Sequence, residues 1–322
     1  MNTAGHHQTG SHPWLTLRSA QRLSIGSART QTSSSVFPTS SWCWTGTTEQ
    51  CGAGMLDAGL ALQVGTLPAT SLVAAVLPAS RSVQIGQPAT AFATIINSGS
   101  STAWGCQIAS PPGLDADFYY QVTDPATNQV VPGFKNYPVR IDPGQSQSFL
   151  IAFTPAASFA PRDVALQFNC ATAPDAPVFS GLNTLFLSSS ATPVPDIVAL
   201  AATLGGDGIV NVPGTSGTGF FAVATVNVGS SSPITASALL GNTSLPVSLS
   251  ICQTNPTTGA CLAPPSASVA TSISAGATPT FAVFGTGSGA IPFDPANNRV
   301  YVVFRDAGGL VRGATSVAVR TQ

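Results

Sequence analysis

The chain has 322 residues, of which only 7% are charged, against roughly 25% in an ordinary soluble domain. A net charge of −1 without a basic stretch argues against nucleic-acid binding, and no apolar run reaches the ~18 residues of a membrane-spanning helix. General disorder is excluded because 43% of the residues are apolar and fall in repeated short runs. Abundant small β-formers and turn residues favour an all-β secreted protein over a helical cytosolic enzyme.

Residues 1–64 carry little regular pattern, and we expect them to be poorly ordered. The start, over 1–14, lacks the basic residues and apolar stretch of a secretory signal. It holds all three histidines of the chain, which we interpret as a solvated tail rather than a metal site: His6, His7 and His12. The stretch 18–29 has arginines and no acid, which faintly resembles an organellar transit segment. We favour a truncated or frame-disturbed gene start, with the export signal upstream.

One short helix is predicted over 55–62, directly after Gly52 and Gly54. Its residues are mostly apolar, so it needs a partner to cover it. A second short helix is possible over 15–25, which contains leucines and arginines and neither glycine nor proline. Because the sequence offers no complete partner for either, we expect this region to be poorly packed.

Period-two alternation begins near Leu77 and predicts a first β-sandwich over 72–190. Apolar residues there alternate with Ser, Gln and Thr, and turn residues separate further short apolar runs at 118–122, 148–153, 164–168 and 182–187. Seven or more short strands with such spacing indicate an Ig-like sandwich.

A linker is predicted next, at 191–196. The run 188–195 is rich in serine and contains two prolines, so we expect it to be extended and exposed. A second sandwich is then predicted over 197–322.

The second half of the chain repeats the first. Asn97-Ser-Gly matches Asn227-Val-Gly at an offset of 130, and 159–168 matches 293–304 at offsets of 134 to 136. Nearly constant offsets at two distant places predict tandem modules of one type. We interpret the shared Asn-x-Gly element as a turn in which both residues tolerate a positive φ.

The six cysteines are expected to form three disulfides. Fifteen pairings are possible, and nearest-partner pairing keeps each bridge within one proposed unit: Cys43–Cys51, Cys106–Cys170 and Cys252–Cys261. The last pair has the strongest support, because Asn-Pro and Thr-Gly steps between its cysteines mark a tight reversal. Zinc is disfavoured, since no C-x-x-C occurs and no histidine lies near a cysteine. Three disulfides imply an oxidising compartment, so we expect an extracellular or cell-surface protein.

The segment Cys51-Gly-Ala-Gly-Met-Leu-Asp-Ala58 is similar to the end of the catalytic domain of secreted bacterial subtilisin-like serine peptidases. In that family a cysteine pair and a Gly-x-Gly precede the last helix, and Cys43 with Cys51 fits the pair. Ser27-Ala-Arg29 also lies where those enzymes often carry a similar tripeptide. The resemblance covers about 15–64 and implies that 1–64 is the remnant of a peptidase domain.

The catalytic triad of that family is absent from this chain. The family uses Asp, then His, then a Ser in Gly-Thr-Ser. Here the first aspartate, Asp57, follows all three histidines, and the one Gly-Thr-Ser, at 214–216, lies far beyond the peptidase-like segment. The resemblance therefore implies ancestry and an upstream parent domain, not activity. The Asn-x-Gly repeats also resemble bacterial Ig-like surface repeats, although Phe168 stands where antibody-type domains carry tyrosine.

No other residue set predicts a catalytic or metal site. Three aspartates match no calcium-loop signature: Asp115, Asp117 and Asp124. The run 205–208 resembles a phosphate turn, but no lysine follows it, so we expect a hairpin turn. Lys135, the only lysine, is expected in an exposed loop. We predict no catalytic residue, no metal and no cofactor.

Several aromatic residues offer rings for stacking on sugars: Trp42, Trp44, Trp104, Tyr119, Tyr120 and Tyr137. Core packing explains most aromatic residues in sandwiches, so sugar binding is the weaker hypothesis.

We expect a non-catalytic C-terminal region of a secreted subtilisin-like peptidase, serving as spacer, anchor or substrate-docking surface. The alternative is a free-standing surface or adhesion protein. The partner would be the upstream peptidase domain, an extracellular protein or a glycan.

Overall fold

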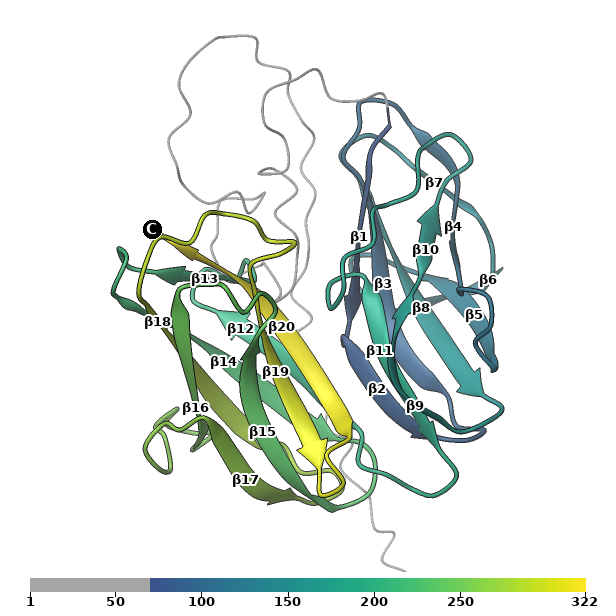
Figure 1. The fold of residues 1–322 in the computed structure, drawn as a ribbon. Helices are drawn as coiled ribbons and strands as arrows, with labels where there is room; N and C mark the ends of the chain where they lie inside the picture. Colours follow the sequence, from purple (N-terminus) through teal and green to yellow (C-terminus); the bar gives the residue numbers. More distant parts are fainter. Residues whose placement is uncertain (1–69) are drawn as a thin grey trace, which may run out of the picture.

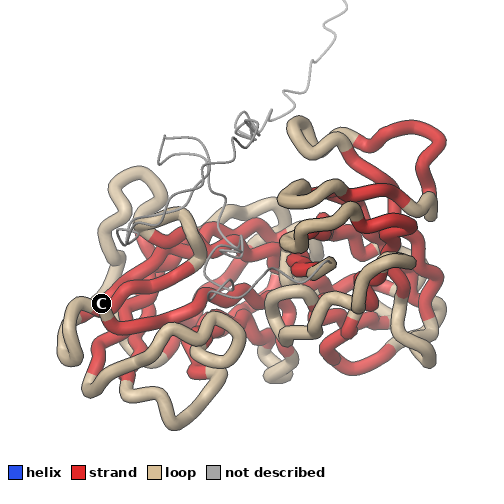
Figure 2. The backbone as a smooth tube through the Cα atoms, turned by 90° about the horizontal axis from the view of Figure 1, so that it is seen from above, coloured by secondary structure: helices blue, strands red, loops and turns tan. Residues whose placement is uncertain are grey.

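A computed structural model describes residues 70–322 as an all-β structure, which confirms the predicted fold class. Figure 2 shows strands joined by loops and turns, and no helix among these residues. None of the described elements is therefore a helix able to cross a bilayer. The predicted remnant over 1–64, its two short helices and the Cys43–Cys51 bridge lie outside the described residues.

The first sandwich, module 1, has one layer made of a five-stranded antiparallel sheet (Figure 1). In spatial order its strands are β1 (Leu72–Leu77), β3 (Ala89–Asn97), β8 (Ser146–Pro155), β5 (Ala116–Thr123) and β6 (Val130–Lys135). The facing layer consists of two three-stranded sheets. Their strands are β2 (Ser80–Gln84), β11 (Thr184–Ser190) and β9 (Phe159–Ala165), and then β10 (Gln167–Asn169), β4 (Ala103–Ala109) and β7 (Val139–Ile141).

The second sandwich, module 2, lies beside module 1 (Figure 1). Its four-stranded sheet contains β12 (Ile197–Thr203), β14 (Thr218–Asn227), β18 (Thr280–Gly287) and β16 (Val247–Thr254). Its five-stranded sheet contains β13 (Ile209–Val212), β20 (Val311–Thr321), β19 (Arg299–Asp306), β15 (Ser232–Leu240) and β17 (Ser268–Ile273).

The two modules share one topology, as the sequence repeat predicts. Each has a parallel pair, β2 with β11 and β13 with β20, among otherwise antiparallel strands. The five-stranded order β13-β20-β19-β15-β17 of module 2 corresponds to the two sheets β2-β11-β9 and β10-β4-β7 of module 1, in which β9 and β10 together take the place of β19. In module 1 this layer is split because β4 ends at Ala109, just before Pro111 and Pro112. Proline has no N–H for a strand ladder, so pairing beyond that point is lost.

Alternating apolar residues fill the space between the two layers of each module. The largest fully buried side chains are Phe149, Phe153 and Phe168 in module 1, and Phe281 and Phe304 in module 2. Full burial of each such ring contributes roughly 1.5–3 kcal/mol. The cores are therefore separate, and each module has the buried apolar cluster that an independent domain needs.

Two of the predicted disulfides are present in the described residues. Cys106–Cys170 joins β4 to the residue after β10 across 64 residues, and Cys252–Cys261 joins β16 to the loop that follows it, 9 residues further along the chain. No described cysteine is free. The long bridge constrains the unfolded chain by about 4 kcal/mol in the chain-entropy picture and the short one by about 2.5 kcal/mol.

The repeated Asn-x-Gly element is a buried side-chain bridge, not a turn with positive φ. Asn97 and Asn227 are fully buried, and neither has a positive φ. The Asn97 amide donates to the carbonyls of Ser101 at 2.8 Å and Ile141 at 3.0 Å, and its Oδ1 accepts from the Gly99 N–H at 3.0 Å.

The same bonds recur in module 2. The Asn227 amide donates to Ser230 O at 2.8 Å and Ile273 O at 3.1 Å, and its Oδ1 accepts from Gly229 N at 3.0 Å. Buried backbone groups need partners, and an amide side chain supplies both donor and acceptor. This requirement, rather than backbone freedom, explains the repeated asparagine.

The linker between the modules spans 191–196, as predicted, and 191–193 are exposed, but the ends of the run 188–196 are buried. Ser188 belongs to β11 and is buried, and Asp196 is buried before β12 begins. The chain is fixed where it passes Gly229, because Ser230 N donates to Val194 O at 3.0 Å. A Cβ on Gly229 would lie 2.3 Å from that carbonyl oxygen, so only glycine permits this approach.

Candidate functional site at the joint between the modules

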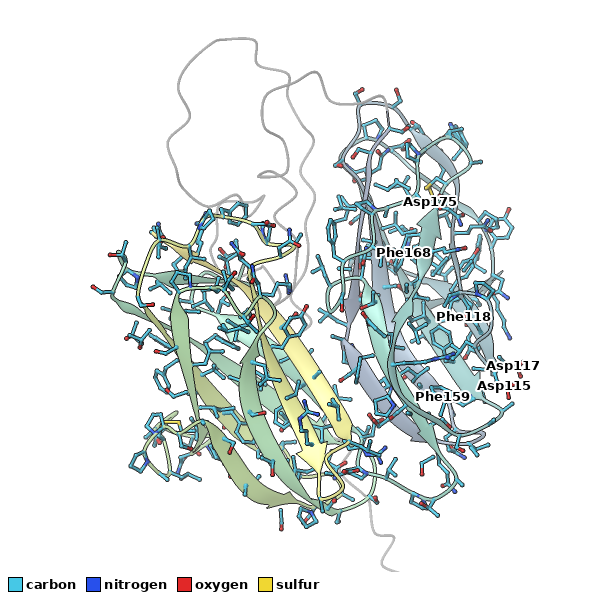
Figure 3. All side chains as sticks on the ribbon, in the orientation of Figure 1. Asp115, Asp117, Phe118, Phe159, Phe168 and Asp175 are labelled. Carbon is cyan, nitrogen blue, oxygen red and sulfur yellow. A yellow bond between two sulfur atoms is a disulfide. The ribbon has the colours of Figure 1, made fainter. Side chains whose placement is uncertain are left out.

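The aspartates considered for calcium do not converge. Asp115 and Asp117 are exposed near the start of β5, close to Phe159 and far from Asp175 (Figure 3). Asp124 lies in the turn after β5, where its carboxylate accepts from the N–H groups of Ala126 at 2.8 Å and Thr127 at 3.0 Å. These bonds lower the pKa of Asp124 and close the turn. Within 70–322 no three acidic, histidine or cysteine side chains form a cluster that could hold a metal.

The glycine-rich run 205–208 is a turn, but not a hairpin. It follows β12, which pairs with β14, and precedes β13, which pairs with β20, so it carries the chain from one sheet to the other. Asp207 Oδ1 accepts from Ile209 N at 2.9 Å and from Thr203 Oγ1 at 3.2 Å. These local bonds occupy the groups that a phosphate would otherwise meet.

Lys135 and two of the six aromatic candidates lie on the surface of module 1. Lys135 ends β6 rather than lying in a loop, and its Nζ is 4.3 Å from the centroid of the Tyr119 ring. Trp104 and Tyr137 are 51% and 54% exposed. Tyr120 instead belongs to the core and packs against Phe149 at 5.7 Å between centroids. Trp42 and Trp44 lie outside the described residues.

The most extensive polar arrangement joins the two modules, and the sequence did not predict it. Arg81 on β2 donates from Nε and Nη2 to Asp196 Oδ2 at 2.9 and 2.8 Å. Ser82 N donates to Asp196 Oδ1 at 2.9 Å. Both charged side chains are nearly buried, at 11% and 4% exposure. The pair therefore ties module 1 to the residue that immediately precedes module 2.

The surroundings of Asp196 set its charge state and its position. Burial raises the pKa of Asp196, while Arg81 and the Ser82 N–H oppose that rise by stabilising the carboxylate. The backbone of Asp196 is held as well: its N–H donates to Asn227 Oδ1 at 3.1 Å, and its carbonyl accepts from Val228 N at 2.9 Å. The repeated asparagine of module 2 thus positions the acid that binds module 1.

A second contact joins the edge strand β2 to β20. Ser80 Oγ accepts from Ala314 N at 2.5 Å and donates to Ala314 O at 3.2 Å. One hydroxyl therefore satisfies both backbone groups of a residue in the other module. Ser80 is buried, so these bonds are protected from water.

A third contact involves the loop before β11. Tyr301 Oη donates to Ser180 O at 2.9 Å, and Ser316 Oγ donates to Gly181 O at 2.9 Å. Arg299, which is 5% exposed, donates from Nε and Nη2 to Ser316 Oγ at 3.1 and 2.8 Å. Burial lowers the pKa of Arg299. Because two donors fill its oxygen lone pairs, Ser316 can only present its proton to module 1.

An open groove of about 270 Å³ runs beside these contacts. Its walls are mainly apolar and come from both modules, and they include Ala79, Phe186, Leu239, Tyr301, Val303 and Arg305. The one carboxylate in its lining, Asp163, accepts from Ser180 Oγ at 2.6 Å. No histidine or lysine lines the groove. Ser180 there meets a carboxylate but no histidine or lysine, and the three contacts described above hold the two modules together beside the groove.

Comparisons with known proteins add little to this picture. No protein-family model matches the chain, and no curated protein matches its sequence. The resemblance of residues 15–64 to subtilisin-like peptidases therefore stays a prediction.

Three solved structures are similar to parts of the chain. A protein of unknown function from Porphyromonas gingivalis W83 is 13% identical, with a TM-score of 0.24, over 77% of this chain and 99% of its own. The secreted serine protease VesC from Vibrio cholerae is 9% identical, with a TM-score of 0.20, over 65% of this chain and 45% of its own. The PapD-like domain 7 of human CEP192 is 13% identical, with a TM-score of 0.23, over 41% of this chain and 94% of its own.

Proposed function

We propose that this chain is a non-catalytic accessory region of a secreted protein, in which two sandwiches act as one stiff unit. The unit would space, anchor or dock an attached subtilisin-like peptidase domain. The observation that carries the proposal is the nearly buried ion pair between Arg81 and Asp196.

Stiffness follows from how the modules are joined. A free linker would leave their relative orientation open, as is usual for tandem domains. Here the connection is short, and the joint has three separate contacts that involve Asp196, Ala314 and Ser316 of module 2. Removing one partner from a buried ion pair typically costs about 3–5 kcal/mol. Bending at the joint would break all three contacts together.

Secretion is supported by the two disulfides of the described region, which persist in oxidising compartments. The link to a peptidase is supported by the Cys51–Ala58 segment, and the lack of activity by the absence of histidine after His12. We expect the purified chain not to hydrolyse casein. Hydrolysis that is lost on substituting one of its own serines would overturn the non-catalytic assignment.

The stiff joint is tested by measuring one distance across it. Spin labels at Thr127→Cys and Thr243→Cys, both exposed, report on modules 1 and 2 in a Cys43→Ser, Cys51→Ser background. Pulsed electron resonance should give one narrow distance distribution that broadens in Asp196→Ala. The matched control is Asp142→Ala, which removes the exposed Arg140–Asp142 pair within module 1 and should leave the distribution narrow. A broad distribution without any joint substitution would contradict the proposal.

A second candidate is a free-standing surface or adhesion protein, which the repeated modules and the sparsely charged surface favour. It predicts an export signal, and no peptidase reading frame, in the DNA upstream of the codon for Met1. The leading proposal predicts peptidase sequence there. Reading that DNA separates the two.

A further inference from the structure

Exposed aromatic side chains gather on one segment of module 1, residues 134–140. Phe134 and Tyr137 are 39% and 54% exposed, and their rings meet edge to face, 5.1 Å apart at an angle of 82°. Lys135 lies between them in sequence and crosses the Tyr119 ring of the adjacent strand β5. Exposed rings held against one another in this way are a common feature of binding surfaces.

The segment is held in place by its central residue. Asn136 has a φ of 50°, a conformation that asparagine adopts more readily than most residues. Its N–H donates to Tyr120 O at 2.8 Å, and its Oδ1 accepts from Tyr120 N at 2.9 Å. Both backbone groups of one β5 residue are thus used to fix the segment. Rings fixed before binding lose little conformational entropy when a ligand arrives.

A further exposed ring adjoins the end of the segment. Trp104 on β4 is the one tryptophan in the described range, and it is 51% exposed. The Arg140 guanidinium of the neighbouring strand β7 lies 5.3 Å from its centroid. The Trp104 backbone is anchored because its carbonyl accepts from Ala171 N at 2.7 Å. Trp104 belongs to the layer β10-β4-β7, so it is an exposed aromatic position separate from the pair of Phe134 and Tyr137.

The charges near these rings leave one cation uncompensated. Arg140 pairs with Asp142 at 3.0 Å, but Lys135 has no ion-pair partner within residues 70–322. Lys135 lies opposite Gln121 on β5. Its ammonium lies over the Tyr119 ring, and the exposed Asp117, two residues from Tyr119 on β5 and about 7 Å along the strand, forms no ion pair with it. Lys135 is therefore available to an anionic group of a ligand.

We propose that residues 134–137, with Tyr119, form a binding face for a polysaccharide that carries carboxylate groups, a function independent of the spacer role. The C–H bonds of a pyranose ring are slightly positive and pack on the negative face of an aromatic ring. Phe134 and Tyr137 offer such faces. The Lys135 ammonium, held beside them over Tyr119, attracts the uronate carboxylate and donates hydrogen bonds to it.

The test uses the full chain with polygalacturonate, alginate and methyl-esterified polygalacturonate in affinity electrophoresis and titration calorimetry. At least one acidic polymer should bind, and Tyr137→Ala should weaken that binding about tenfold. Lys135→Gln should weaken binding of the acidic polymers about fivefold and leave binding of the ester unchanged. The conservative Tyr137→Trp should retain affinity.

Leu204→Ala serves as the control, since Leu204 is 82% exposed on module 2 and should not change binding. Thermal unfolding of each variant should match that of the parent chain, because the substituted side chains are exposed. Failure of both acidic polymers to bind would overturn the proposal, as would binding that Tyr137→Ala leaves intact. Binding of casein through Tyr137, without polysaccharide binding, would assign the face to a protein partner and also overturn it.

Discussion

The guanidinium of Arg81 in module 1 donates two hydrogen bonds, at 2.9 and 2.8 Å, to the carboxylate of Asp196, which immediately precedes module 2. The two residues are 115 positions apart and nearly buried. In a chain with so few charges, this pair connects the two cores more specifically than apolar contact would. An apolar interface tolerates sliding, whereas a two-pronged ion pair fixes one geometry.

Arg81→Ala should lower the free energy of unfolding by about 3 kcal/mol, because Asp196 would stay buried without its counter-charge. Urea denaturation followed by circular dichroism measures the change. The control, Arg140→Ala, breaks an ion pair whose side chains are 55% and 45% exposed, so its own contribution should be at most about 1 kcal/mol. Equal effects of the two substitutions would show that burial of the joint is unimportant.

Asp196 should titrate above the value of 3.8 for an unperturbed aspartate, because burial raises its pKa. A raised pKa in the folded state means that folding favours the protonated acid. The contribution of this group to stability is then fully present below pH 3.8 and is lost as the pH rises through the folded-state pKa. The unfolding free energy of the parent chain minus that of Asp196→Asn should therefore fall over this window. A carboxyl carbon chemical shift that titrates below 3.8 would contradict the expectation.

Gly181→Ala should destabilise the joint for two reasons. The residue has a φ of +71°, and a Cβ there would lie 2.6 Å from Tyr301 Cε1 of module 2. The control is Gly144→Ala, with a φ of +70° and no atom within 4 Å of the added Cβ. The control should cost about 1 kcal/mol for the backbone conformation alone. Gly181→Ala should cost about 1–3 kcal/mol more, and Tyr301→Ala in the same chain should relieve the excess.

Asn97→Ala and Asn227→Ala should each cost about 2–4 kcal/mol, because each leaves buried backbone groups without partners. Asn227 additionally accepts from the Asp196 N–H, so Asn227→Ala should lower the free energy of unfolding by about 1 kcal/mol more than Asn97→Ala does. Chemical denaturation of both variants tests this order. Asn242→Ala, at an exposed loop position, should cost under about 1 kcal/mol and controls for loss of an asparagine as such. A larger loss of stability in Asn97→Ala than in Asn227→Ala would show that the bond from Asp196 N–H to Asn227 does not stabilise the joint.

Much of the fold was predictable because it depends on local pattern. Alternation around Ile95 and Phe149 reports which face of a strand is buried, and the repeated Asn97 and Asn227 report that one module type occurs twice. The reason given for the asparagines was wrong, since their side chains bond carbonyls contributed by strands 44 and 46 residues away. A short sequence window does not contain those partners.

The linker shows the same limit. Serines and prolines at 188–195 favour an exposed tether, yet Ser188 is buried in β11 and Asp196 is buried against Arg81. One local signal was available, since Asp196 is an isolated charge at the start of an apolar strand and such a charge needs a partner. Nothing local identifies which of the arginines supplies it.

The amino-acid sequence by itself determined the strands, the modular repeat and the short Cys252–Cys261 bridge, because side-chain alternation, offsets and short loops are properties of neighbouring residues. Only the tertiary structure decided that the modules form a joint, that Arg81 meets Asp196 there, and that the Phe134 and Tyr137 rings meet edge to face at the surface. Those contacts depend on how whole sheets pack, and packing brings together residues that no local interaction connects.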